Sequence, residues 1–330
     1  MKKILFICPR NPFSERYSGD VIRAKKTIYF LSKNHYVKVI SSDFKNSQKK
    51  ESKLSYEGFK EINLFSKIFY IFFSFIKLRP IQLGYFFSPK IKEYVQNNFQ
   101  DYDLIFFQSF RTAQYMPEGN NKTCILDMGD LMSKNYKQTS VRYFFFNPIR
   151  VIYYIESLLV KKYESSCFKK FSKILLLSKR EIDSVEKKFK GKLAQFSFGV
   201  TNINKKYSFH QKNFKIIFIG NIKYAPNKKA CYEFANKILP LINEIYPNIE
   251  FHIIGEISKI DKFLLKKKTN VKILGKIKNL DPYLDKTICG MANLKIATGI
   301  QTKLLTYMSY GIPSVCSQEV IKNFDAIKEN

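Results

Sequence analysis

The chain has 330 residues, which is more than one hydrophobic core usually spans and suits two domains of about 150 residues each. The formal net charge is +30, but only eight of the 57 basic residues are Arg. With abundant Ile, Asn, Phe and Tyr and no Trp, this composition is typical of an AT-rich genome rather than of a polyanion site. No nucleic-acid-binding motif accompanies it, so we expect no nucleic-acid partner.

Neither a leader nor a membrane span is predicted. The N-terminal "MKKILFICPRNP" has five apolar residues before Pro9 and Arg10 interrupt it, which predicts a first strand rather than a signal peptide. The most apolar window has nine uncharged residues, 68–76, whereas a bilayer-spanning helix needs about 20. The six cysteines are scattered without a CxxC pair. This pattern predicts buried free thiols and a cytoplasmic location.

Short apolar runs alternate with helix-period stretches along the chain, a pattern that predicts parallel sheets covered by helices. In the first half, we expect strands at residues 3–8, 36–41, 103–108, 123–128 and 173–178. Helices are expected from Asp20, from Pro148 to about Phe171, and from Ser178, where Ser178 and Glu181 match a capping box.

The second half repeats this alternation after a polar, aperiodic stretch. We place a linker at 199–213, between an N-terminal Rossmann-like domain (1–198) and a C-terminal one (214–330). Strands are expected at 214–219, 249–255 and 271–275, and a helix after Pro226. The stretch "GIQTKLLTYMSYGIPSV", 299–315, predicts a loop, a helix and a strand.

Two loops of the second half could carry chemistry, because ligands of such folds bind at the carboxyl ends of the strands. Gly220 follows a buried strand, and Lys303 follows Gly299 by four residues at a predicted helix start. Backbone N–H groups and an amine at a helix start bind anions. The alternative interpretation is an ordinary turn and a solvated lysine.

The ordered segments "FIGNIKYAPN", "ILPLINEIYPNIEFHIIG" and "ANLKIATGIQTKLLTYMSYGIPSVCS" resemble the donor-binding domain of glycosyltransferase family 4. They are most similar to the sugar transferases of bacterial exopolysaccharide clusters. In the first half, "SGDVIRAKKTIYFLSK" and "CILDMGDLMSKNY" resemble that group's N-terminal loop and helix and its acidic loop. The resemblance implies an α/β GT-B fold, with two Rossmann-like domains whose parallel sheets face each other across a cleft.

The same resemblance implies a reaction and its partners. A sugar would pass from a nucleotide-sugar donor to a hydroxyl of a polysaccharide or lipid-linked saccharide, with retention at the anomeric carbon and without a metal or cofactor. Loop amides, helix starts and Lys can stabilise the charge of the leaving diphosphate. No cluster of His, Cys and Asp with metal-ligand spacing is present.

The resemblance also assigns residues. It implies an acceptor side that includes Gly19 and Asp20, and an acidic loop that includes Asp127 and Asp130. It also implies a donor site, which is formed by Gly220, Asn221, Gly299, Ile300, Gln301, Lys303 and Thr306. Gly220 and Asn221 would contact donor phosphate or sugar, residues 299–301 would line the donor sugar, and Lys303 would pair with the diphosphate. The two aspartates either orient an acceptor hydroxyl or cap the helix that follows.

Three departures from the family pattern stand out. Thr306 occupies the position of a Glu that binds the nucleotide ribose, and every Arg lies at or before Arg180, so the second half has only Lys to bind diphosphate. The sequence also ends where relatives continue through further helices, which predicts shortened C-terminal helices from a truncated reading frame or a minimal form. These departures keep open a catalytically silent sugar-nucleotide-binding homologue or scaffold.

Two aromatic and aliphatic stretches, 64–87 and 142–163, are flanked by Lys and Arg. Such a composition is typical of an interfacial helix on anionic lipid, but also of a packed core helix. We leave both interpretations open for the first stretch and favour a core helix for the second. A peripheral position on the inner face of the plasma membrane is the corresponding hypothesis for location.

Overall fold

The computed structural model describes residues 1–14, 19–43, 47–141, 147–197, 214–277, 279–295, 297, 301–322 and 324. The chain divides into two compact units, Met1–Ser197 and Phe198–Asn330. The stretch 199–213, predicted as a linker, lies outside the described residues.

The N-terminal unit contains an eight-stranded sheet with the order β3-β4-β2-β1-β5-β6-β7-β8. All neighbours pair in parallel except β3, which runs antiparallel to β4. The strands are β1 (Lys3–Cys8), β2 (Tyr36–Asp43), β3 (Gln48–Lys50), β4 (Leu54–Lys60), β5 (Leu104–Gln108), β6 (Thr123–Gly129), β7 (Lys173–Leu176) and β8 (Leu193–Gln195). The five strands predicted for this half are confirmed.

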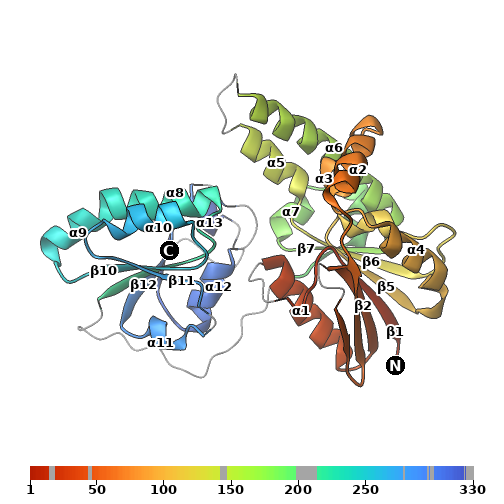
Figure 1. The fold of residues 1–330 in the computed structure, drawn as a ribbon, viewed down its shortest axis with the longest axis horizontal. Helices are drawn as coiled ribbons and strands as arrows, with labels where there is room; N and C mark the ends of the chain where they lie inside the picture. The colour runs from red at the N-terminus through yellow and green to blue at the C-terminus, as the bar shows by residue number, and fades with distance from the viewer. Residues whose placement is uncertain are drawn as a thin grey trace. The chain divides into compact units, whose positions relative to one another are not determined.

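Helices cover both faces of this sheet, as the ribbon shows (Figure 1). They are α1 (Gly19–Ser32), α2 (Leu64–Ile76), α3 (Ile81–Tyr85), α4 (Pro89–Asn98), α5 (Met132–Ser140), α6 (Pro148–Lys170) and α7 (Lys179–Asp183), with short 3-10 turns at Phe99–Asp101, Thr112–Tyr115 and Lys187–Lys192. Successive β1 side chains point to opposite faces, so Phe6 packs with Ile28 of α1, while Ile7 belongs to the core with Val95 of α4 and Val160 of α6. None of the described helices is long and apolar enough to cross a membrane.

The C-terminal unit contains a five-stranded parallel sheet with the order β11-β10-β9-β12-β13. Its strands are β9 (Lys215–Ile219), β10 (Glu250–Ile254), β11 (Val271–Gly275), β12 (Thr287–Ala292) and β13 (Ser314–Cys316). Its helices are α8 (Ala225–Glu233), which continues through a π-helical turn (Phe234–Ile238) into α9 (Leu239–Ile245), then α10 (Lys259–Lys266), α11 (Asp281–Leu284), α12 (Thr302–Ser309) and α13 (Gln318–Ile321). Helices α8 to α10 lie on one face of the sheet, and α11 and α12 on the other (Figure 1).

Tyr307 anchors α12 to the sheet. Its side chain is fully buried, and its hydroxyl accepts the Ile219 N–H at 3.0 Å and lies 3.2 Å from the Met291 carbonyl oxygen. Gly290 of β12 leaves the space for the ring, because a Cβ there would lie 2.5 Å from the Tyr307 ring. These contacts fix which side of α12 faces the sheet.

Candidate functional site

The strand order places a topological switch point between β9 and β12 in the C-terminal unit. The chain leaves β9 toward β10 on one side, and it returns to pair β12 with β9 on the other. Loops that leave the carboxyl ends of two such strands diverge and open a ligand-binding crevice. Here these loops are the one after Ile219, which leads to α8, and the one after Ala292, which leads to α12.

Lys303 is buried at this edge rather than solvated. It precedes Tyr307 by four residues, so both side chains lie on the sheet-facing side of α12. The Lys303 Nζ donates to Asn227 Oδ1 at 2.7 Å and lies 4.2 Å from the centroid of the Phe218 ring. Burial lowers the pKa of Lys303 to about 8. Lys303 is therefore not one of the solvated surface lysines that are common in this lysine-rich chain.

Asn227 connects this amine to the loop after β9. Its Nδ2 donates to the carbonyl oxygen of Asn221 at 2.9 Å, while its Oδ1 accepts from Lys303. Gly220 makes this approach possible, since a Cβ at that position would lie 3.0 Å from Asn227 Nδ2. The starts of α8 and α12 are therefore joined at the end of β9.

The positive charge of Lys303 makes the carboxyl ends of β9 and β12 suitable for binding an anion. Among the described residues, no carboxylate pairs with Lys303, and Asn227 is the one hydrogen-bond acceptor of its ammonium group. An ammonium group has three N–H donors and is costly to bury unless they are used. In the described parts of the chain, no group of three or more His, Cys, Asp or Glu side chains could hold a metal ion.

The other residues predicted for this site have different positions. Gly299 and Ile300 lie outside the described residues. Gln301 directly precedes α12, and Asn221 is exposed, with its Oδ1 accepting the Lys223 N–H at 3.0 Å. Thr306 is partly exposed and donates to the Thr302 carbonyl oxygen at 3.1 Å, so it does not belong to the core.

In the N-terminal unit, Asp127 at the end of β6 is engaged in a buried ion pair. Arg23 of α1 donates from Nε to Asp127 Oδ2 at 2.6 Å and from Nη2 to Oδ1 at 2.8 Å. The same guanidinium donates to the Phe196 carbonyl oxygen at 2.7 Å. Both Asp127 oxygens thus accept from one Arg, which ties α1 to the sheet.

Asp130, three residues later, is placed differently. Its Oδ1 is buried and has no hydrogen-bond partner among the described residues. Burial, together with the nearby Asp127 charge, raises the pKa of Asp130 against the effect of Arg23. A buried carboxyl group with a free oxygen and a raised pKa is the kind of group that exchanges a proton with a ligand.

Glu181 lies in the same neighbourhood, and here the predicted capping box is only half formed. The Ser178 hydroxyl accepts the Glu181 N–H at 3.3 Å, as expected. The carboxylate, however, accepts the N–H of Leu131 at 2.7 Å. Burial raises the pKa of Glu181, and the Asp130 charge adds to the rise. The Glu181 carboxylate therefore binds the loop that contains Asp130 and Leu131, and not the backbone at the start of α7.

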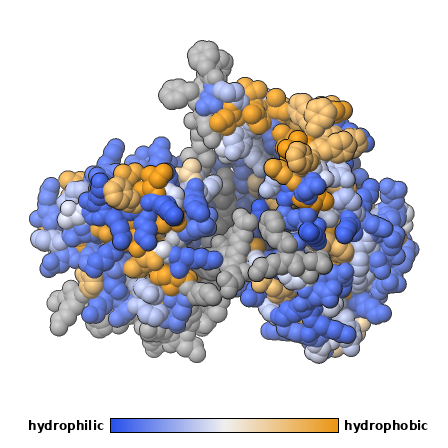
Figure 2. Space-filling model, in the orientation of Figure 1, coloured by the Kyte–Doolittle hydropathy of each residue, from blue (hydrophilic) through white to orange (hydrophobic). Residues whose placement is uncertain are grey.

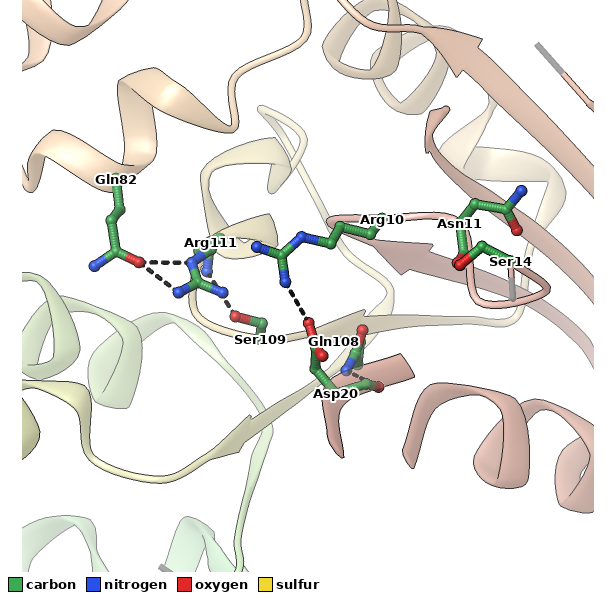
Figure 3. A network of polar contacts seen from close by, with 8 residues as sticks. All are labelled: Arg10, Asn11, Ser14, Asp20, Gln82, Gln108, Ser109 and Arg111. Atoms are coloured by element: carbon green, nitrogen blue, oxygen red, sulfur yellow. Dashed lines mark hydrogen bonds and ion pairs between the residues drawn. The ribbon is translucent and has the colours of Figure 1, made fainter. Parts of the chain in front are cut away.

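The predicted acceptor-side residues belong to a polar network at the carboxyl ends of β1 and β5 (Figure 3). Gly19 and Asp20 begin α1; the Asp20 carboxylate pairs with Arg10 at 2.7 Å, and the Asp20 carbonyl oxygen accepts from Gln108 Nε2 at 3.0 Å. Arg111 donates from Nε at 2.7 Å and from Nη2 at 2.5 Å to Gln82 Oε1.

A pocket of about 330 Å³ adjoins this network. It lies where β1, β2 and β4 end, and its lining combines polar and aromatic side chains: Arg10, Asn11, Asp43, Glu61, Tyr85 and Phe86. The volume is that of a small-molecule site.

Sequence reasoning missed Arg10, Arg23, Arg111 and Asn227. One signal in the sequence could have found the first three: Arg is rare in this chain, whereas Lys fills most basic positions. An Arg in a chain that otherwise uses Lys indicates a need for its planar fork of donors, which Lys cannot provide.

Residues 213–329 match the family model described as "Glycosyl transferases group 1". No curated protein matches the chain. Solved structures share the fold of nearly the whole chain. HepE from Anabaena, in complex with UDP and glucose, is 12% identical with a TM-score of 0.61, and the alignment covers 98% of this chain and 83% of that one.

A trehalose-phosphate synthase (UDP-forming) from Burkholderia xenovorans, in complex with glucose-6-phosphate, is 8% identical with a TM-score of 0.65, over 98% of this chain and 87% of that one. TarM is 16% identical with a TM-score of 0.53, over 73% of this chain. The chain covers 46% of the length of TarM. The solved structures confirm the predicted GT-B fold, and the family match places a glycosyltransferase domain at residues 213–329.

Proposed function

We propose that the chain transfers a sugar from a nucleotide-sugar donor to an acceptor hydroxyl, with the donor diphosphate bound at the switch point of the C-terminal unit. The observation that carries this proposal is the buried Lys303 ammonium group, which is held between the starts of α8 and α12 and has no carboxylate partner among the described residues. This point lies within the segment that matches the glycosyltransferase family model. The UDP held by HepE supports a uridine nucleotide as the donor.

In this reaction the site must stabilise the negative charge that develops on the diphosphate as the sugar leaves. The Lys303 ammonium can supply part of it, and Asn227 orients this group through Oδ1. Donors fixed in place before the reaction stabilise such charge without reorganisation. We propose a reaction that needs no metal ion and retains the configuration of the anomeric carbon, as the resemblance to family 4 implies.

The acceptor side of the proposal lies in the N-terminal unit. Asp20 belongs to the network beside the 330 Å³ pocket, and Asp130 offers a buried oxygen without a partner among the described residues. We propose that the pocket binds the acceptor saccharide and that Asp130 orients its hydroxyl. We assign this role to Asp130 rather than to Asp127, because Arg23 already donates to both Asp127 oxygens.

A catalytically silent homologue that binds sugar nucleotides would keep the same donor site. The two functions differ in turnover. Incubation of the full chain with radiolabelled UDP-, GDP- and ADP-sugars and a membrane lipid extract should transfer label to acceptor material if the chain is an enzyme. Binding of a donor without transfer in any combination would favour the silent homologue.

We also propose that the chain works at an anionic membrane surface. Helix α2 has one buried residue, Ser74, and packs on α3 where Gly84 meets the Tyr70 backbone. Its remaining surface exposes large apolar side chains: Leu64, Phe65, Ile68, Phe69, Phe72, Phe73, Phe75 and Ile76. The first half of α6 does the same with Ile149, Val151, Ile152, Tyr154, Ile155 and Leu158. Our preference for a core helix in this second stretch was therefore wrong for the first half of α6.

Figure 2 shows apolar side chains gathered over this part of the N-terminal unit. Helix α2 has no acidic residue, and Glu156 of α6 is buried, where it accepts the Ile81 N–H at 2.9 Å. Lys77 stands at the end of α2. Apolar aromatic surface with cations and without exposed carboxylates suits the interface of an anionic bilayer. This position supports an acceptor carried by a lipid, and a role in surface polysaccharide assembly on the inner face of the plasma membrane.

A further inference from the structure

Two guanidinium groups lie close together at the carboxyl edge of the N-terminal sheet. Arg10 follows the end of β1, and Arg111 follows the end of β5. Their central carbons lie 5.0 Å and 4.6 Å, respectively, from the centroid of the Phe86 ring. Figure 3 shows the Arg10 guanidinium directed at Asp20 and the Arg111 guanidinium directed at Gln82. Burial lowers the pKa of Arg111, and the charge of Arg10 acts in the same direction, against the effects of Tyr136 and Asp20.

The carboxylates nearby neutralise only one of these two charges. Asp20 is 2.7 Å from Arg10, but Arg111 donates to the neutral amide oxygen of Gln82. No carboxylate of the described residues lies within ion-pair distance of Arg111. The remaining acidic groups of the pocket have other partners: Glu61 pairs with Lys67, and Asp43 accepts from Asn11, Ser47 and Tyr56.

Such an arrangement is unfavourable for the protein alone. Like charges repel more strongly where water is excluded, and the partly buried Arg111 guanidinium has a neutral amide oxygen in place of a carboxylate. A bound anion removes both costs, and Arg is the side chain whose paired N–H donors match the oxygens of a phosphate or carboxylate. Arg10 lines the pocket of about 330 Å³, so an anionic group at the two arginines would leave room for a sugar.

We propose that the acceptor saccharide carries a negatively charged group, a phosphate or a carboxylate, which Arg10 and Arg111 bind together. This inference rests on the proposed function only in calling the ligand an acceptor. It adds a class of substrate that the donor site says nothing about. The observation behind it is that Arg111 donates to the neutral Gln82 oxygen, so no carboxylate of the described residues balances its charge.

The test compares three probes that share a sugar ring: glucose 6-phosphate, glucuronate and glucose. Each is titrated into the full chain by calorimetry or ligand-observed NMR, with saturating UDP to occupy the donor site. We expect at least one charged probe to bind about tenfold more tightly than glucose, the scale of a charge-assisted contact. The phosphate and carboxylate arms tell which anion is preferred.

Arg111→Gln and Arg10→Gln should each weaken the charged probe about tenfold and leave glucose unaffected. Arg10 is partly exposed, so R10Q keeps the test valid if R111Q fails to fold. Arg180→Gln is the matched control, because Arg180 is an exposed residue of α7 in the same unit. It should behave as the wild type.

Equal affinity for glucose and both charged probes would overturn the inference, as would no binding of any probe or an equal loss in R180Q. The titration is repeated without UDP, and UDP binding is measured by itself. Failure of UDP to bind would contradict the proposed function, while preferential binding of a charged probe in that repeat would still support the anion site.

Discussion

Asp127 and Arg23 join α1 to β6 through two hydrogen bonds that are almost closed to solvent. Asp127→Asn removes the negative charge and leaves the Arg23 guanidinium buried. We expect the free energy of unfolding to fall by about 3–5 kcal/mol, the usual cost of breaking a buried pair. A double variant, Arg23→Met with Asp127→Leu, should recover most of this loss. Urea unfolding measures both, and a D127N chain as stable as the wild type would contradict the structural role.

Lys303 gives the chain a pH dependence whose direction is fixed. Its pKa in the folded chain is about 8, below the value of about 10.4 in an unfolded chain. Above pH 8 the folded chain releases this proton while the unfolded chain keeps it, so this residue makes the free energy of unfolding rise between pH 8 and about 10.4. The rise amounts to at most about 1.4 kcal/mol per pH unit.

Urea unfolding of the wild type and Lys303→Met at pH 7.5, 8.5 and 9.5 isolates this contribution. We expect the wild type to gain stability relative to K303M as the pH rises. Parallel curves would mean that Lys303 is solvated in the folded chain.

At the scale of residues, the sequence could predict that Lys303 begins a helix at a loop, but not that it is buried. Burial follows from Tyr307, whose ring enters the sheet at Gly290 four residues later. The pairing of Arg23 with Asp127 joins residues 104 positions apart, and no local pattern predicts such a contact. The resemblance to family 4 implies that Asp20 lies on the acceptor side, but it could not indicate that Arg10 and Gln108 share its network.

Helix α2 is the element that carries the membrane hypothesis. The double variant Phe65→Ser with Phe69→Ser removes two rings that are exposed to solvent in the free protein. Each ring would contribute about 1.5–3 kcal/mol to membrane binding if it became buried in the bilayer. Sedimentation with vesicles containing phosphatidylglycerol should therefore weaken at least tenfold, with no change in thermal stability. Ile260→Ser with Phe263→Ser on α10 is the matched control, because these side chains are equally exposed in the other unit. Equal loss in both variants would contradict a specific role for α2.

Strong apolar runs became strands as predicted, whereas weaker ones were missed. Strand β4, "LSYEGFK", buries only Leu54, Tyr56 and Gly58, so its alternation is short and mixed with polar residues. Strand β12, "TICGMA", contains a Gly whose place is explained only by the Tyr307 ring that packs on it. The Ser178 capping box was correct in its backbone half and wrong in its carboxylate half, because Leu131 supplies a donor from another loop.

For the molecule as a whole, alternation of strands and helices was sufficient to predict two parallel-sheet units. It could not predict the strand order, since hydrophobic periodicity does not say which strands are neighbours. That order decides where the candidate site lies: β12 returns beside β9, and so brings α12 and Lys303 to the loop after Ile219.

The central claim, that this edge holds the diphosphate of a nucleotide-sugar donor, is tested most directly by calorimetric titration of UDP at pH 7. The variants are Lys303→Met and, as control, Lys229→Met, an exposed lysine of α8. Loss of a charge-assisted contact worth about 1.5–3 kcal/mol should weaken UDP binding tenfold or more in K303M. K229M should bind as the wild type does. Unchanged UDP affinity in a K303M chain that melts like the wild type would contradict the account.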